Sequence, residues 1–246
     1  MYLTEVSLLE QTKKQFTFKV KAFLGSLTSL LTVQIVAMLF SLNGVGSMGM
    51  GGNSLILTIK SFSGNLVFFF SIFWAFIMAI TLTTKPYRYM DFSFVTNRLS
   101  SHLSTIALLV LYSLIASVTA MLSGILLRVI MYFTFDGANI IGNHFFLPLS
   151  ELLLGIYIGT LYIMLFATIG YFIGMFVQIN KLFGFIIPAI IIGWVIIEQK
   201  TIDTFSGLTF FFHELSVLLF SVKVLVTVTV LLAVVIMVTN RLEVRK

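Results

Sequence analysis

Residues 67–80 read VFFFSIFWAFIMAI, a run without a single charged side chain. The apolar stretch extends from about Asn65 to Thr83, close to the roughly 20 residues that an α-helix needs to cross a ~30 Å hydrocarbon core. Apolar residues occupy every face of such a helix, so it has no polar side to present to water. The stretch therefore predicts a membrane-spanning helix.

The whole chain has the composition of a membrane protein. Of its 246 residues, 59% are hydrophobic and only 10% are charged, with a mean hydropathy of +1.09. A soluble domain is about a quarter charged, and a fold of this size in water could not bury so much apolar surface in one core. The absence of cysteine excludes disulfides and thiolate metal sites, and the three histidines lack metal-ligand spacing.

Five further apolar runs accompany residues 65–83. We predict an all-α, polytopic membrane protein with a transmembrane domain over residues 22–239. Its six spanning helices cover residues 22–42, 65–83, 104–127, 152–177, 182–197 and 217–239. The fifth span is short and contains Pro188, and only residues 178–181 separate it from the fourth. One bent, partly re-entrant segment is the alternative for that region.

Lysine and arginine predict the orientation. Three of the 15 basic residues (Lys60, Arg128 and Lys200) fall in one set of predicted loops, and Lys223 lies within the sixth span. The opposite set of loops and tails holds the other eleven: Lys13, Lys14, Lys19, Lys21, Lys85, Arg88, Arg98, Lys181, Arg241, Arg245 and Lys246. This richer side, with both termini and the tail 240–246, is predicted to be cytoplasmic. Two ends on one side require an even number of crossings.

The segment before the first span, residues 1–21, is predicted to contain an amphipathic helix from Glu5 to Lys21. Apolar residues recur at helical spacing in it, and four lysines accompany them. We expect this helix to lie on the cytoplasmic leaflet, and an ordinary polybasic flank is the alternative. Because the basic residues cluster beside apolar runs, the net charge of +6 indicates anionic lipid and not nucleic acid as the partner.

Two segments are predicted to face outward. Residues 43–64 begin NGVGSMGMGG, which contains Gly44-x-Gly46-x-x-Gly49. A dinucleotide site needs this motif between a strand and a helix of a βαβ unit, so we interpret the segment as a flexible loop. Residues 198–216 include FSGLTFFFHEL, which is too apolar for a free loop and too short to span, and which we expect to dip into the outer leaflet.

Some residues inside the predicted spans have two interpretations each. Lys223 is either a functional intramembrane charge or a lysine whose ammonium reaches the outer interface, and we favour the second. The pairs Gly155-x-x-x-Gly159 and Gly170-x-x-x-Gly174 predict close helix packing.

The longest predicted cytoplasmic loop reads TKPYRYMDFSFVTNRLSSH over residues 84–102. Its arginines and aromatic residues are typical of a protein contact, and an aromatic belt with positive-inside residues is an equal alternative. The chain contains no Walker A, HExxH or GxSxG motif. We therefore expect transport or scaffolding and no enzymatic activity.

These features together resemble a permease subunit of the type-2 ATP-binding-cassette transporters, chiefly exporters. The resemblance rests on the basic N-terminal helix, the six spans, the loop between spans two and three, and the apolar segment FSGLTFFFHEL before the last span. The stretch DFSFVTNRLSSH, from Asp91 to His102, is similar to the family's segment in which an arginine precedes the third span. The chain also resembles small permeases of Gram-positive bacteria.

The resemblance implies a multi-pass protein of the plasma membrane that pairs with a second permease chain, as a homodimer or a heterodimer. Each chain would dock a separate ATPase, which alone carries ATP and Mg²⁺, so no cofactor is expected in this chain. Docking is assigned to the loop from Tyr87 to Arg98, and the second and fifth spans would line the translocation path. The implied docking residues are Tyr87, Arg88, Asp91, Phe92 and Arg98, and the implied path residues are Phe69, Phe73, Phe76 and Pro188.

Two other functional classes stay open at this stage. The first is a membrane-embedded sensor, binding subunit or scaffold without a transport cycle, and the second is an intramembrane enzyme. Association with an ATPase would separate the permease from both of them.

Overall fold

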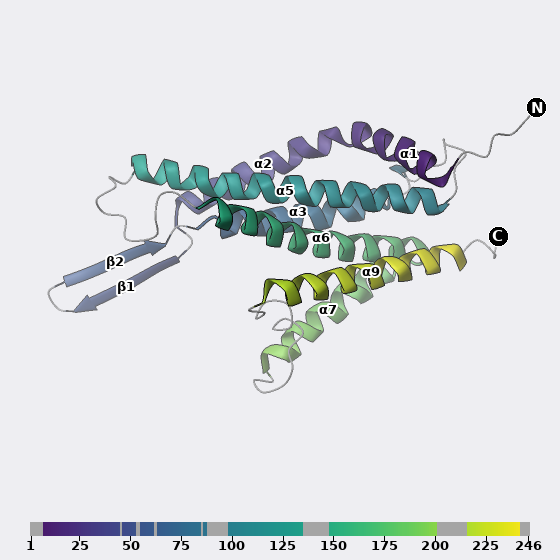
Figure 1. Ribbon diagram of the computed structural model, residues 1–246. Coiled ribbons are helices and arrows are strands. Elements are labelled where there is room, and N and C mark those ends of the chain that lie inside the picture. Colours follow the sequence, from purple (N-terminus) through teal and green to yellow (C-terminus); the bar gives the residue numbers. More distant parts are fainter. Residues whose placement is uncertain are drawn as a thin grey trace, which may run out of the picture.

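The computed structural model describes residues 7–44, 46–52, 55–61, 63–84, 86–87, 98–134, 148–200 and 216–241. Most of them form a bundle of long helices (Figure 1). In chain order the elements are α1 (Leu8–Ala22), α2 (Leu24–Leu42), β1 (Gly46–Gly52), β2 (Leu55–Ser61), α3 (Asn65–Leu82), α5 (Arg98–Thr134), α6 (Leu149–Ile179), α7 (Phe183–Lys200) and α9 (Val217–Arg241).

Five of the described helices are long and apolar enough to cross a membrane. They are Leu24–Leu42, Asn65–Leu82, Leu99–Thr134, Leu149–Ile179 and Val217–Thr239. These helices confirm a polytopic membrane protein and coincide with five of the six predicted spans. The third and fourth are longer than predicted, with 36 and 31 residues. The remaining predicted span, residues 182–197, coincides with α7, which is not among the five.

The predicted N-terminal helix exists as α1. It begins after Ser7, whose hydroxyl oxygen accepts a hydrogen bond from the Glu10 backbone N–H at 3.3 Å. However, α1 runs alongside the first turns of α5 (Figure 1). Gln15 and Lys19, on its side toward α5, are buried. The helix is thus packed on protein along one side.

The predicted helical architecture is confirmed, but the prediction of a flexible loop over residues 43–64 was wrong. β1 and β2 pair antiparallel, from Gly46 opposite Ser61 to Gly52 opposite Leu55. The second strand reads LILTIKS, which is rich in the branched residues that favour extended backbone. This hairpin projects beyond one end of the bundle (Figure 1).

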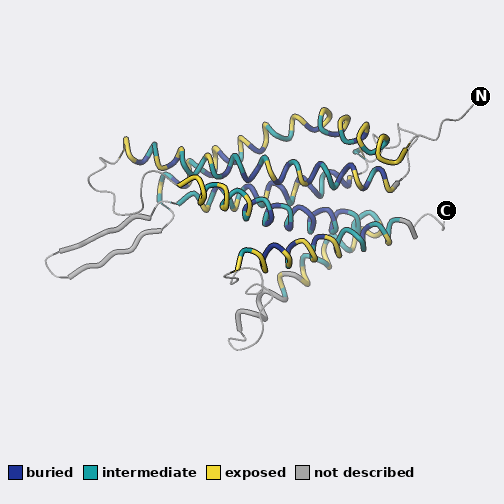
Figure 2. The backbone as a smooth tube through the Cα atoms, viewed as in Figure 1, coloured by how far each residue is buried: buried dark blue, intermediate teal, exposed yellow. Residues whose placement is uncertain are grey.

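The core of the bundle follows the contacts between helices. The largest buried cluster joins α2, α3, α5 and α6, with Trp74, Leu108 and Ile163 among its members. A second cluster holds α9 on α6 through residues such as Leu165 and Val224. In Figure 2 the buried positions run along these internal faces and the exposed positions lie outside.

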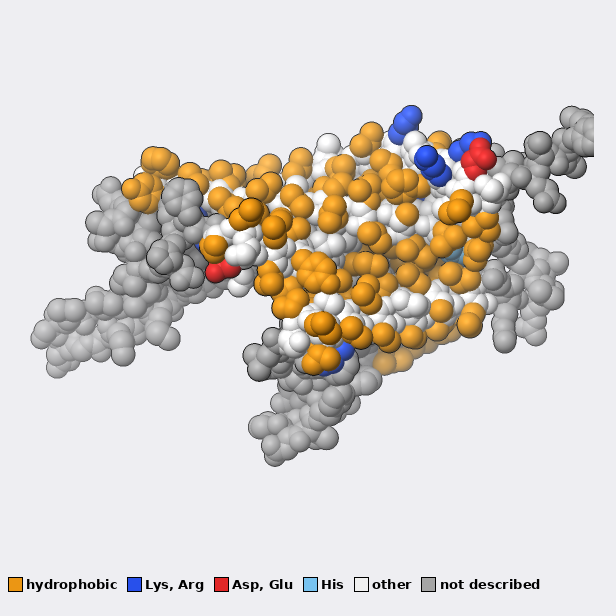
Figure 3. All heavy atoms as spheres, viewed as in Figure 1, with side chains coloured by type: hydrophobic (Ala, Val, Ile, Leu, Met, Phe, Trp, Pro, Cys, Tyr) orange, Lys and Arg blue, Asp and Glu red, His pale blue; other side chains and the backbone are white. Residues whose placement is uncertain are grey.

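The outer surface of the bundle is apolar. Figure 3 shows hydrophobic side chains over most of the visible helical surface, whereas Lys and Arg side chains gather over α1 at one end. Phe40, Ile77 and Val226, on three different helices, are each more than half exposed. A continuous apolar surface of this extent is unstable in water and stable in lipid.

Two glycines let α6 approach α3 closely. A Cβ atom on Gly170 would lie 2.5 Å from the carbonyl oxygen of Phe76, and one on Gly174 would clash with the side chain of Thr83, the residue that follows α3. Gly159 is similarly close to Ser117 of α5 and Phe68 of α3. The glycine pairs of the sequence therefore serve packing within one chain.

The variant Gly170→Ala is expected to destabilise the bundle by about 1–3 kcal/mol, because the new methyl group meets backbone that cannot move aside. The measurement is the melting temperature of the purified protein in detergent. Gly25→Ala is the matched control, since a Cβ atom there meets nothing within 4 Å. Equal melting temperatures for the two variants would contradict the close approach of α3 and α6.

Polar groups within the bundle bond across helices. The Gln34 side chain is 2% exposed, and its amide nitrogen donates to Ser71 Oγ at 2.9 Å, Thr119 Oγ1 at 2.9 Å and the Ala116 carbonyl at 3.3 Å. Gln34 thereby connects α2 to α3 and α5 at once. In lipid this connection replaces the water that an isolated amide would need.

We expect Gln34→Leu to lower the free energy of unfolding by about 1 kcal/mol, the scale of interhelical hydrogen bonds in membranes. The check is the midpoint of unfolding by a denaturing detergent, compared with Thr32→Val. Thr32 is an exposed residue of the same helix whose hydroxyl bonds only locally, to the Thr28 carbonyl. A Gln34→Leu protein as stable as this control would show that the three-helix contact is dispensable.

Candidate functional site

One end of the bundle concentrates the polar contacts between helices. We call it the basal end, and define it by Leu8 of α1, Leu82 of α3, Arg98 of α5, Ile179 of α6 and Arg241 of α9 (Figure 1). The hairpin lies at the opposite end. The segment that the sequence assigns to partner docking joins α3 to α5 at this basal end.

The N-terminal helix is fastened to α5 by buried polar groups. Lys19, 5% exposed, donates from Nζ to Thr105 Oγ1 at 2.7 Å and to the Ser101 carbonyl at 3.1 Å. One turn earlier, the hydroxyl of Ser100 donates to Gln15 Oε1 at 2.8 Å, and Gln15 is 1% exposed. We call these five residues the polar clasp.

The same turns of α5 also contact α6. His102 Nδ1 and the Tyr171 hydroxyl lie 2.8 Å apart, and both side chains are buried. Nearby, the Gln178 side-chain amide at the end of α6 donates to the carbonyl oxygen of Thr83, just after α3. The ends of α3, α5 and α6 are thus bonded to one another as well as to α1.

A joint at Phe23 separates α1 from α2. Its backbone leaves the helical conformation, with φ −102° and ψ 11°. The Tyr112 hydroxyl donates to the Phe23 carbonyl at 2.8 Å, and the Tyr87 ring centroid lies 4.9 Å from that of Phe23. The joint is therefore contacted by Tyr112 of α5 and by Tyr87, which lies five residues after the end of α3.

The predicted docking residues are described only in part. Tyr87 is half-buried on Phe23, so its ring stabilises the bundle and is not a freely exposed contact. Arg98 is the first residue of α5, although its side chain lies outside the described part of the structure. Arg88, Asp91 and Phe92 lie outside the described residues altogether.

The predicted path residues do not gather at one place inside the chain. Phe69 and Phe73 are 55% and 53% exposed on the outer face of α3, with ring centroids 5.3 Å apart. Phe76 is partly buried, and its carbonyl faces Gly170 of α6. Pro188 is half-buried within α7, which packs against α6.

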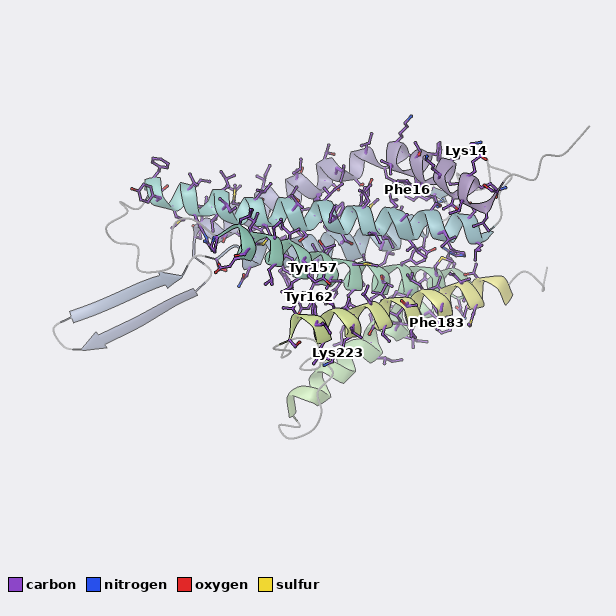
Figure 4. The ribbon with its side chains drawn as sticks, in the orientation of Figure 1. Lys14, Phe16, Tyr157, Tyr162, Phe183 and Lys223 are labelled. Carbon is purple, nitrogen blue, oxygen red and sulfur yellow. The ribbon has the colours of Figure 1, made fainter. Side chains whose placement is uncertain are left out.

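Lys223 lies near the start of α9, half-buried, at the end of the bundle away from the basal end (Figure 4). Its neighbourhood includes Phe220, which packs on Tyr162 of α6 with ring centroids 4.6 Å apart, and Ser221, whose Oγ accepts from the Tyr157 hydroxyl at 3.0 Å. The position fits either interpretation of Lys223 that the sequence allows.

The polar clasp is what sequence reasoning missed. Gln15 and Lys19 stand four residues apart, on one face of a helix, and the stretch from Ser100 to Thr105 contains Ser100, Ser101, His102, Ser104 and Thr105. The two polar stripes were visible, but their pairing requires α1 to lie alongside α5. The lysine instead resembled an ordinary basic flank.

Among the described residues, no group of three or more His, Cys, Asp or Glu side chains could hold a metal ion. Comparison with known proteins adds no further constraint: no family model, no curated protein and no solved structure matches the chain. The basal end, with its polar clasp and joint, is therefore the candidate site on geometry alone.

Proposed function

We propose that the chain is the permease subunit of an ATP-driven exporter in the plasma membrane. A separate ATP-binding-cassette ATPase would bind at the basal end and supply the hydrolysis of ATP with its Mg²⁺. A second permease chain, identical or different, would complete the transporter. In this proposal the chain itself carries no catalytic residue.

The proposal takes the basal end as cytoplasmic and α7 as a sixth span. Two facts support this topology. The α1 start and the α9 end lie at the same end of the bundle, as an even number of crossings requires (Figure 1). All eleven basic residues expected in the cytoplasm belong to α1, to a helix end at the basal end or to a segment that adjoins such an end in the sequence. Of these, Lys13, Lys14 and Lys21 are exposed on α1.

Helix length supports a platform beyond the hydrocarbon. At 1.5 Å per residue, the 37 residues of α5 extend about 55 Å, whereas the hydrocarbon core is ~30 Å thick. The first turns of α5 are rich in serine and are bonded to α1, so they are suited to the region outside the hydrocarbon. A soluble partner could reach this platform without entering lipid.

The observation that carries the proposal is the anchoring of the α3–α5 connection at both of its ends. Tyr87 packs on the Phe23 joint before the connection, and α5 after it is bonded to α1 by the polar clasp. A partner that moves this connection would therefore move α5 and, through the polar clasp and the Phe23 joint, α1 and α2. A transporter driven by a soluble ATPase needs such a place, where movement of the ATPase is passed to the spanning helices.

The exposed phenyl groups of α3 are compatible with a path formed between two chains. Phe69 and Phe73 point out of the bundle, where a second permease could face them. Phe76 and Pro188 belong to the two helices that would line this path. In this proposal the path lies between two chains, and these residues do not line a cavity within one chain.

We expect the double variant Arg88→Ala/Arg98→Ala to reduce the amount of co-purified ATPase roughly tenfold, because arginines at the centre of a contact carry much of its energy. Affinity-tagged chain is purified from native membranes in mild detergent, and the ATPase is identified and quantified by mass spectrometry. The rate of ATP hydrolysis by the co-purified ATPase is then measured in proteoliposomes.

Arg128→Ala is the matched control, since Arg128 is an exposed arginine near the far end of α5. It should leave ATPase recovery unchanged. Recovery of an ATPase that the double variant does not reduce would refute the docking assignment. A chain that never associates with an ATPase would instead be a sensor, binding subunit or scaffold.

A further inference from the structure

The structure carries a second role for the basal end, located in α1 and not in the docking loop. On the side of α1 toward the bundle, Gln15 and Lys19 are buried beside the partly buried Phe16 and Val20, while apolar Leu9 and Phe18 remain exposed. The packed side of α1 is therefore partly polar, unlike the apolar face through which an amphipathic helix ordinarily packs on protein. Polar bonds consequently act together with apolar contacts in holding α1 in place.

Directional bonds of this kind hold a helix at one axial position. Lys19 Nζ reaches Thr105 Oγ1 at 2.7 Å, while Thr105 Oγ1 itself bonds the Ser101 carbonyl at 2.9 Å. Sliding α1 by one turn, about 5.4 Å, would break these bonds as well as the one between Gln15 and Ser100. Apolar contacts from Phe16 and Val20 would tolerate smaller slips, so the register depends on the polar groups.

The lysine is the strongest of these links. A charged donor forms hydrogen bonds roughly twice as strong as those between neutral groups, and a buried polar group that loses its acceptors is costly. Lys13, Lys14 and Lys21 on the same helix are exposed. In Figure 4, Lys14 projects from the outer side of α1, which leaves Lys19 as the lysine directed into the interface with α5.

We propose that Lys19 is a positioning residue that locks α1 to the start of α5, so that displacement of the α3–α5 connection reaches α2 through the Phe23 joint. The transmission step rests on the proposed function, but the lock does not. One turn separates Lys19 from Phe23, whose N–H donates to the Lys19 carbonyl at 2.9 Å. Movement of α5 would thus be passed along α1 directly to the joint.

The absence of cysteine allows a direct test of the lock in the full chain. Spin labels are attached at Thr17→Cys and Val110→Cys, which are exposed positions on α1 and α5. The distance between the two labels, measured by double electron–electron resonance, reports where α1 lies relative to α5. A second pair, Val36→Cys and Val110→Cys, reports α2 against α5 and serves to detect general unfolding.

In Lys19→Met, which keeps an apolar stem but removes the donors, we expect the fraction of chains with displaced α1 to rise roughly tenfold. The distance from α2 to α5 should not change. Lys19→Arg should restore the narrow distribution, and Lys21→Met, which removes an exposed lysine of the same helix, should leave it narrow. A narrow α1–α5 distribution in Lys19→Met would overturn the lock.

The transmission step is tested in the purified complex with the ATPase. Lys19→Met should keep the ATPase bound but lose stimulation of its turnover by transport substrate or lipid, with rescue by Lys19→Arg. Normal stimulation despite a displaced α1 would overturn the transmission step. Failure to recover any ATPase would refute the proposed function, and the distance measurement would still decide whether Lys19 locks α1.

Discussion

Inside a bilayer a polar group has no water to bond, and this constraint governs how the helices of this chain are joined. Among the described residues, no buried side-chain nitrogen or oxygen lacks a hydrogen-bond partner. Gln34 satisfies its amide by contacting two other helices, and the Ser117 hydroxyl donates to the Ile156 carbonyl of α6 at 2.8 Å. Polar residues therefore bond particular helices to one another, whereas apolar residues face both lipid and core.

The two ends of the bundle differ in structure. At the basal end, buried lysine, glutamine, serine and threonine side chains bond α1 to α5, and His102 and Tyr171 bond α5 to α6. At the other end, the described helices lead into a hairpin that projects from the bundle. In the proposed transporter, these bonds would make a displacement of one helix at this end displace the others as well.

Close packing contributes a second kind of rigidity. Where α6 crosses α3, Gly170 and Gly174 leave no space for a side chain, so α6 lies directly against the Phe76 backbone and the Thr83 side chain. By contrast, α9 is held on α6 by apolar side chains, with the bond between Tyr157 and Ser221 as a polar addition. In the proposed transporter the α1–α3–α5–α6 block would move as a unit, while α7 and α9 join it through α6.

The sequence by itself determined that this is a membrane protein, where five of its spanning helices lie, and that α6 must pack closely, because hydrophobic length and glycine spacing are local properties of the chain. It did not reveal the hairpin, since a glycine-rich strand resembles a loop until its partner LILTIKS is placed beside it. Nor did it reveal the burial of Lys19, which resembles the exposed lysines around it in the sequence. Only the tertiary structure decided that burial, because a lysine becomes a buried link between helices when a neighbouring helix brings Ser101 and Thr105 within reach.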